Sequence, residues 1–93
     1  MLYLFLADGF EETEALAPLD CIRRAKIKIL TVGVGGERIT GSHGIEVRAD
    51  ITEGAVDFTQ CEGVLLPGGM PGTENLYASD AIKDTIAFCA ENN

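Results

Sequence analysis

No apolar run in this 93-residue chain is long enough to span a membrane, and basic residues are scarce. The apolar run 2–7 is cut short by Asp8 and has no basic segment before it, so we interpret it as a strand and not as a signal peptide. Lysine and arginine number 7 against 15 aspartates and glutamates, which gives a net charge of −8. Phosphate backbones repel such a charge, so we predict no nucleic-acid partner, and the missing span predicts no membrane partner.

Metal-binding and cofactor-binding patterns are also missing. His43 is the single histidine, and Cys21, Cys61 and Cys89 form no C-x-x-C pair. No second histidine or cysteine stands at metal-ligand spacing, and neither G-x-x-x-x-G-K-[ST] nor G-x-G-x-x-G occurs, so we predict no metal and no cofactor. An odd cysteine count without a secretory signal favours a reducing cytoplasm.

What is present is a series of short apolar runs that predicts an α/β fold. The run 2–7 is apolar throughout, as is typical of a strand buried on both faces of a parallel sheet, and 27–34 is predicted to be a second strand. The segment 11–26 between them has acidic residues first, basic residues last and apolar residues at helical spacing, so it predicts a helix and hence a βαβ unit. Pro18 lies inside that helix, where we expect a kink or an irregular turn.

The remainder of the chain predicts a hairpin, a loop and a further βα unit. Apolar and charged residues alternate over 45–51, which predicts a half-exposed strand paired with 38–40 through a turn at 41–44. The segment 52–62 is expected to be a loop or one helical turn, and a further helix is expected to begin at Ser79.

Only three parallel strands result, and strands this apolar need further neighbours and helices on both faces. We therefore expect residues 1–93 to be the amino-terminal half of a doubly wound domain. Alone, this half is expected to be inactive and poorly soluble, because its sheet lacks the partner half.

The clearest candidate site follows the third strand. Pro67 ends a short buried strand at 64–66, and Gly68 and Gly69 come next. Backbone N–H groups of these glycines, bare of side chains, could hold an oxyanion or, together with Met70, a substrate. The alternative is a plain tight turn between a strand and a helix.

Glu14 is the candidate acid. It follows the first strand, so it should lie at the same edge of the sheet as Gly69. Desolvation in such a crevice can keep a carboxyl group protonated and let it act as a general acid or base. The alternative is a solvated carboxylate at a helix start, as we expect for Glu11 and Glu12. His43 is more typical of a turn residue than of a base or a ligand.

None of the cysteines is a convincing nucleophile. Cys21 and Cys89 fall on helical segments near apolar stripes, where a small hydrophobic role is expected. Cys61 precedes the third strand, at the opposite edge of the sheet from Gly69. We therefore predict acid and oxyanion groups in this chain without the nucleophile that they would serve.

Two motifs, G-F-E-E-x-E at 9–14 and L-P-G-G at 66–69, resemble the amino-terminal half of the ThiJ/PfpI superfamily. The resemblance is nearest to the branch of deglycases similar to Parkinson disease protein seven and their bacterial ThiJ-type relatives. Shorter matches lie at 4–8, 18–20, 23–25 and 75–76.

This resemblance implies a flavodoxin-like three-layer sandwich with a mostly parallel sheet, incomplete in this chain and usually a homodimer. Glu14 matches the family's protonated glutamate, which hydrogen-bonds a reactive cysteine, and Gly69 matches the glycine whose N–H faces that cysteine. The cysteine and its frequent histidine partner are implied to lie beyond residue 93. Cys89 does not match the reactive cysteine, and His43 matches a position near the dimer interface.

The resemblance also implies a range of activities: glyoxalase without a cofactor, deglycase, peptidase, chaperone and redox sensor. We expect the complete protein to act on a small reactive aldehyde or a glycated adduct. The alternatives are a non-catalytic redox sensor or chaperone, and the older association of the ThiJ name with thiazole monophosphate biosynthesis. Class I glutamine amidotransferases share the fold logic, but the motif at 9–14 favours the ThiJ/PfpI superfamily.

Overall fold

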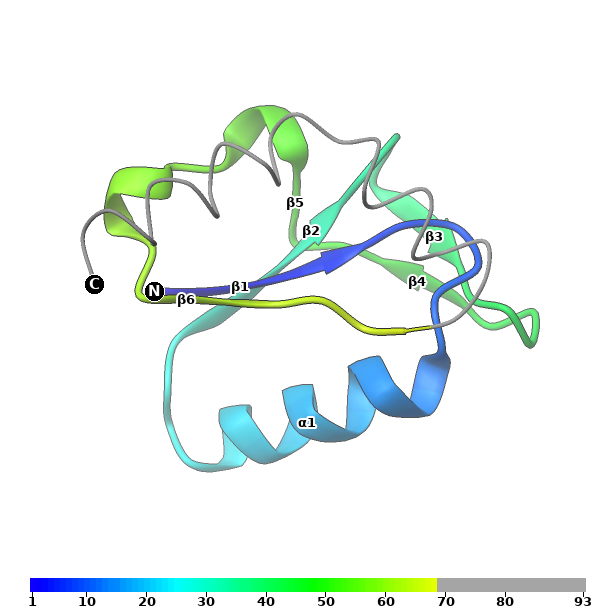
Figure 1. Ribbon diagram of the computed structural model, residues 1–93, viewed down its shortest axis with the longest axis horizontal. Coiled ribbons are helices and arrows are strands. Elements are labelled where there is room, and N and C mark those ends of the chain that lie inside the picture. The colour runs from blue at the N-terminus through cyan, green and yellow to red at the C-terminus, as the bar shows by residue number, and fades with distance from the viewer. Residues whose placement is uncertain (69–93) are drawn as a thin grey trace.

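The structure, a computed structural model, describes residues 1–68 (Figure 1). Four strands, β1 (Leu2–Leu6), β2 (Ile29–Gly33), β5 (Ile51–Thr52) and β6 (Gly63–Leu65), form a parallel sheet in the order β5-β2-β1-β6. The predicted α/β class with a mostly parallel sheet is therefore confirmed. Three predictions lie outside the described residues: the helix from Ser79, the placement of Cys89, and the roles of Gly69 and Met70.

Helix α1 (Glu12–Arg24) covers one face of the sheet, and β1, α1 and β2 make the predicted βαβ unit. Ala15 and Leu19 are buried against Leu4 and Leu6, which point to that face because alternate residues of a strand face the same way. The helix continues through Pro18 without an assigned break, so no irregular turn interrupts it.

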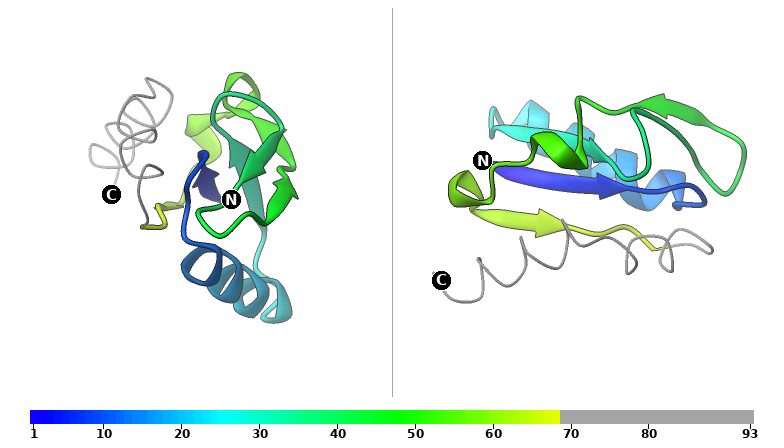
Figure 2. Two further views of the ribbon diagram at one scale, coloured as in Figure 1. Left: turned by 90° about the vertical axis from the view of Figure 1, so that its right-hand side faces the viewer. Right: turned by 90° about the horizontal axis from the view of Figure 1, so that it is seen from above.

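The opposite face of the sheet is covered by the segment between β5 and β6 (Figure 2, left). Two 3-10 turns, η1 (Glu53–Ala55) and η2 (Phe58–Gln60), shape this segment, as the sequence predicted for a stretch too short for a longer helix. Tyr3 and Phe5 are buried on this side, and the Tyr3 hydroxyl donates to the Asp57 carbonyl at 3.1 Å. Both faces of β1 are thus buried, as its unbroken apolar run requires.

Strands β3 (Arg38–Thr40) and β4 (Glu46–Arg48) form the predicted antiparallel hairpin, with Ile39 opposite Val47. Ile39 is 1% exposed and belongs to the cluster on the α1 side of the sheet. The hairpin lies at the end of the sheet where β1 and β2 finish (Figure 1).

One predicted strand, 45–51, is divided by the structure into β4 and β5. The Ala49 amide donates to the Glu37 carbonyl at 2.7 Å, but the next amide, of Asp50, donates to Thr31 Oγ1 in β2 at 2.8 Å. The backbone therefore changes partner at Asp50 and joins the main sheet as β5. The prediction of three parallel strands was wrong for this reason, because β5 is a fourth.

Two smaller predictions were also wrong, one about the burial of a strand and one about where a strand begins. The run 64–66 was expected to be a buried strand, but β6 is half-buried and Leu66 is 42% exposed. Among the described strands β6 pairs with β1 alone, so one of its edges lacks a described neighbour. The second strand begins at Ile29 and not at Ile27, which is 50% exposed.

Ile39→Ala tests whether the hairpin is fixed to the core through this side chain. We expect the free energy of unfolding to fall by about 2–5 kcal/mol, because the substitution leaves a cavity at a fully buried position. Ile45→Ala, in the same hairpin but 50% exposed, is the matched control and should change stability little. Urea denaturation of the two variants checks this, and equal losses would contradict it.

Candidate functional site

Three segments meet at the carboxyl edge of the parallel sheet: the β1–α1 loop, the hairpin turn and the residues after β6. The Gly9 amide donates to the Thr40 carbonyl at 2.8 Å, and the Thr40 amide donates to Asp8 Oδ1 at 3.0 Å. The Glu11 amide donates to the Gly68 carbonyl at 2.9 Å. Backbone hydrogen bonds thus hold the start of α1 to both of the other segments.

Glu14 lies against the first glycine of the glycine turn. A Cβ atom added to Gly68 would stand 3.0 Å from Glu14 Oε2 and 3.5 Å from Oε1, so the carboxylate occupies the space where a side chain would be. Glu14 is otherwise exposed within this chain. The structure brings Glu14 and Gly68 together at the expected edge, while the roles predicted for Glu14, Gly68, Gly69 and Met70 stay predictions.

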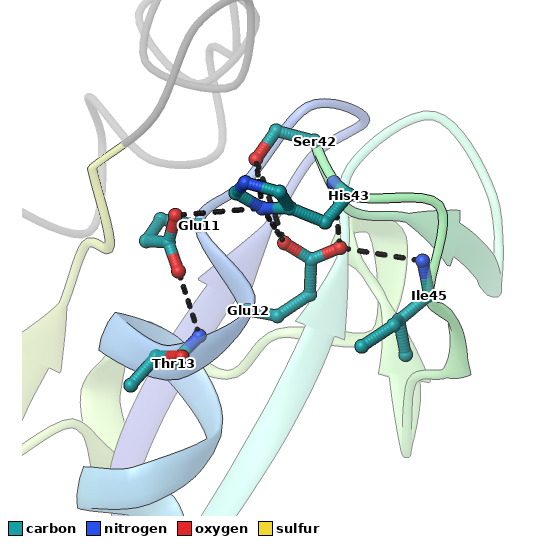
Figure 3. A network of polar contacts seen from close by, with 6 residues as sticks. All are labelled: Glu11, Glu12, Thr13, Ser42, His43 and Ile45. Atoms are coloured by element: carbon teal, nitrogen blue, oxygen red, sulfur yellow. Dashed lines mark hydrogen bonds and ion pairs between the residues drawn. The ribbon is translucent and has the colours of Figure 1, made fainter.

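Glu12 is the carboxylate that the sequence analysis misjudged. It was expected to be solvated, but it is 5% exposed and its carboxylate lies against the hairpin turn (Figure 3). Its Oε2 accepts hydrogen bonds from the backbone amides of His43 at 2.8 Å and Ile45 at 3.2 Å. Its Oε1 lies 3.1 Å from His43 Nδ1 and 3.4 Å from Ser42 Oγ. The first turn of α1 therefore closes over the hairpin turn through one buried side chain.

These contacts shift the pKa values of both Glu12 and His43. Burial alone would raise the Glu12 pKa, but hydrogen bonds from its own backbone amide, from His43 and from Ile45 lower the pKa from 4.5 to about 2. The hydrogen bond to Glu12, helped by the charges of Glu12 and Glu11, raises the pKa of His43 above 6.5. Because an ionised carboxylate only accepts hydrogen bonds, the proton between the two residues lies on His43 Nδ1.

The hairpin turn is shaped around the Glu12 carboxylate. A Cβ atom on Gly41 would collide with Glu12 Cδ and Oε2, so a side chain there would displace the carboxylate from its hydrogen bonds. Gly44 has a φ of 84°, which favours glycine. The sequence signal for this network was the polar pair Ser42-His43 with a glycine on each side. That pattern did not predict which carboxylate the turn would contact.

Glu11, Glu12 and His43 could in principle hold a metal ion, since each offers one ligand atom and these atoms lie within 4.8 Å of one another. Hydrogen bonds from the hairpin turn to both Glu12 oxygens, and from the Thr13 amide to Glu11 at 3.0 Å, account for the cluster without an ion. The absence of a metal stays a prediction.

The two described cysteines lie away from this edge of the sheet. Cys61 is buried before β6, at the opposite end of that strand, as predicted, and its thiol donates to the Gly63 carbonyl at 3.4 Å. Cys21 lies on α1, as predicted, but it is exposed, so the small hydrophobic role expected for it was wrong. Leu16, Leu19 and Ile22 occupy the buried or half-buried face of the helix instead.

Comparison with protein families gives a match along the whole chain. The model of the DJ-1/PfpI family matches residues 1–93. This chain belongs to the DJ-1/PfpI family. The resemblance seen in the motifs at 9–14 and 66–69 is thereby confirmed.

Two curated DJ-1/PfpI relatives illustrate the similarity. A Parkinson disease protein 7 homolog from Danio rerio is 36% identical over 85 residues, covering 89% of this chain and 45% of the relative. Deglycase TK1284 from Thermococcus kodakarensis is 35% identical over 63 residues, covering 68% of this chain and 38% of that protein.

Solved structures agree on the fold. The structure titled "Toxoplasma gondii DJ-1, oxidized" superposes with a TM-score of 0.88 at 30% identity, covering 92% of this chain and 47% of that one. The chain therefore spans about half the length of the Danio rerio and Toxoplasma gondii proteins. Within residues 1–68, no helix has the length and hydropathy needed to cross a bilayer.

Gly41→Ala tests whether this DJ-1/PfpI chain depends on close contact between the hairpin turn and Glu12. The added methyl group collides with the Glu12 carboxylate, so we expect unfolding to become easier by about 1–3 kcal/mol. Gly54→Ala is the matched control, because a Cβ there meets nothing within 4 Å. Thermal or urea denaturation distinguishes the two, and a neutral Gly41→Ala would overturn this account of the turn.

The stability of the protein should also depend on Glu12 in acid. The pKa is lower in the folded state than the ordinary 4.5, so this stabilisation is present above pH 4.5 and is lost as the pH falls toward 2. Glu12→Gln should be less stable than wild type at pH 6, and the difference should shrink between pH 4.5 and 2. Glu46→Gln removes an exposed hairpin carboxylate and serves as the control for urea titrations at each pH. A constant difference would count against this assignment.

Proposed function

We propose that the complete protein is a cysteine-dependent enzyme that acts on reactive aldehydes or glycated adducts, in the manner of a glyoxalase or deglycase. The observation that carries the proposal is the Glu14 carboxylate against Gly68, at the edge of the sheet where parallel α/β proteins place their ligands. Membership of the DJ-1/PfpI family supports it, as does the deglycase name of the Thermococcus kodakarensis relative.

The chemistry assigns one role to each group. A cysteine thiolate, proposed to lie in the complete protein beyond residue 93, attacks the aldehyde carbon of methylglyoxal and forms a C–S bond. The carbonyl electron pair moves to oxygen, where the Gly69 N–H stabilises the negative charge and Glu14 supplies the proton.

Product release from this adduct needs no oxidant. A proton moves from the first carbon to the second, giving a thioester, and water hydrolyses that thioester. Methylglyoxal and one water thus become lactate, and the thiol is regenerated with neither an external oxidant nor a reductant.

The Glu14 carboxyl group must be shielded from water for this role. It is exposed in the chain, and a general acid of this kind works best where water is excluded from it. We propose that the carboxyl-terminal half of the same domain covers it, and that the complete protein is a homodimer. The half-length match to DJ-1 relatives supports the first of these partners.

Glu14→Gln in the complete protein tests the proposed role. Glutamine keeps the shape of the side chain but has no carboxyl proton to transfer, so kcat for methylglyoxal should fall by about 10²–10⁴-fold. Glu46→Gln, a surface carboxylate of the hairpin with the same charge change, should keep wild-type kcat. Lactate formation is the measurement.

Two results would contradict the proposal. Full activity in Glu14→Gln would remove Glu14 from the mechanism. No turnover by wild type, together with peroxide-induced sulfinate at its cysteine, would favour the redox-sensor alternative.

A further inference from the structure

We propose that His43 is a further substrate-binding residue, which contacts the carrier part of a glycated adduct, and that Glu12 is the positioning residue that orients it. The carrier is the amino acid or peptide to which the aldehyde is attached. The inference rests on the proposed function for its substrate class, while the geometry of the Glu12–His43 pair is independent of that function.

The position of His43 follows from its contact with Glu11. The Glu11 amide donates to the Gly68 carbonyl at 2.9 Å, and Glu11 Oε2 lies 3.7 Å from His43 Nδ1. Glu11 therefore contacts both the first glycine of the turn and the imidazole. Figure 3 shows the ring lying between the Glu11 and Glu12 carboxylates, above the start of α1.

The orientation of the ring follows from Glu12. The buried Oε1 atom lies 3.1 Å from Nδ1, and the backbone amide of His43 donates to Oε2 at 2.8 Å, so side chain and backbone are held by one carboxylate. The imidazole is nevertheless 71% exposed, and Nε2 makes no hydrogen bond with the residues that the structure describes. A fixed Nδ1 and an exposed Nε2 make a pre-oriented hydrogen-bonding group.

The charges around the ring favour its protonated form, in which Nε2 is a hydrogen-bond donor. Glu11 and Glu12, at the start of α1, face the ring, and Ser42 Oγ in the hairpin turn lies 3.1 Å from Nδ1. The two carboxylates favour the protonated imidazole. A protonated ring that gives its Nδ1 proton to Glu12 has Nε2–H left for an oxygen of the ligand. The carbonyl and carboxylate oxygens of an amino acid or peptide carrier are such acceptors.

The contacts of Glu11 with both Gly68 and His43 indicate which substrates can reach His43. We therefore place a free three-carbon aldehyde at Glu14 and Gly68, and only a longer adduct at His43. An adduct has its carrier bonded to the reacting carbon, so the carrier can meet Nε2. In turnover of a hemithioacetal the enzyme thiolate replaces the carrier thiolate on that carbon, and the carrier leaves as a free thiol. His43 should therefore affect binding of adducts and leave free methylglyoxal unaffected.

The test is a comparison of two substrates with the complete protein. Turnover of methylglyoxal alone is compared with turnover of the hemithioacetal that methylglyoxal forms with N-acetylcysteine. The concentration of the hemithioacetal is varied while that of free methylglyoxal is held constant. His43→Ala should raise KM for the hemithioacetal about tenfold, the cost of one charge-assisted hydrogen bond, with kcat and all methylglyoxal kinetics unchanged. Glu12→Gln should also raise that KM, and Glu46→Gln should not.

A second measurement follows the pair without turnover. Long-range ¹⁵N–¹H spectra of wild type should show His43 protonated at Nδ1, with a pKa above 6.5 that falls toward 6.5 in Glu12→Gln and is unchanged in Glu46→Gln. The hemithioacetal should shift the His43 ring signals, and His43→Ala assigns those signals.

The outcomes separate this inference from the proposed function. If wild type shows no turnover but the adduct shifts the His43 signals, the proposed function fails and the binding role stands. If His43→Ala affects both substrates equally, or neither, the binding role is wrong although the enzyme is active. An unshifted ring on adding adduct, or a His43 pKa that ignores Glu12→Gln, also overturns the inference.

Discussion

The buried carboxylate of Glu12 is the constraint on which the edge of this sheet depends. An ionised group at 5% exposure is tolerated only when donors surround it, and those donors come from a turn about thirty residues later in the chain. The start of α1 and the hairpin turn therefore cannot adopt their conformations separately. Gly41 completes the arrangement, since any side chain there would occupy the space of the carboxylate.

The first turn of α1 connects the segments that make up the candidate site. The Glu11 amide holds Gly68, the Glu12 side chain holds the hairpin turn, and the Glu14 carboxylate packs against Gly68. Adjacent helical residues point in different directions, so one turn of helix reaches several neighbours at once. The proposed chemistry at Glu14 thus relies on a helix start that is fixed from two sides.

Much of the fold could be predicted because local patterns and connection rules specify it. The apolar run 2–7, the amphipathic segment 11–26 and the run 27–34 led to β1, α1 and β2, and the rule that parallel strands end at one edge placed Glu14 beside the glycine turn. β5 was missed because alternation continues unbroken across 45–51, while the change of hydrogen-bonding partner at Asp50 depends on Thr31 in another strand. Cys21 was misjudged because it is next to the apolar stripe of α1 in the sequence but lies outside the face that the helix buries.

The sequence by itself determined the fold class, the family and the edge of the sheet on which chemistry is expected, because these follow from periodicity, strand order and two short motifs. Only the tertiary structure decided which of three neighbouring glutamates is buried. Glu11, Glu12 and Glu14 look alike in the sequence, since each suits the start of a helix. Their environments differ because a distant turn brings its amides to Glu12 alone, and such long-range hydrogen bonds leave no local pattern in the chain.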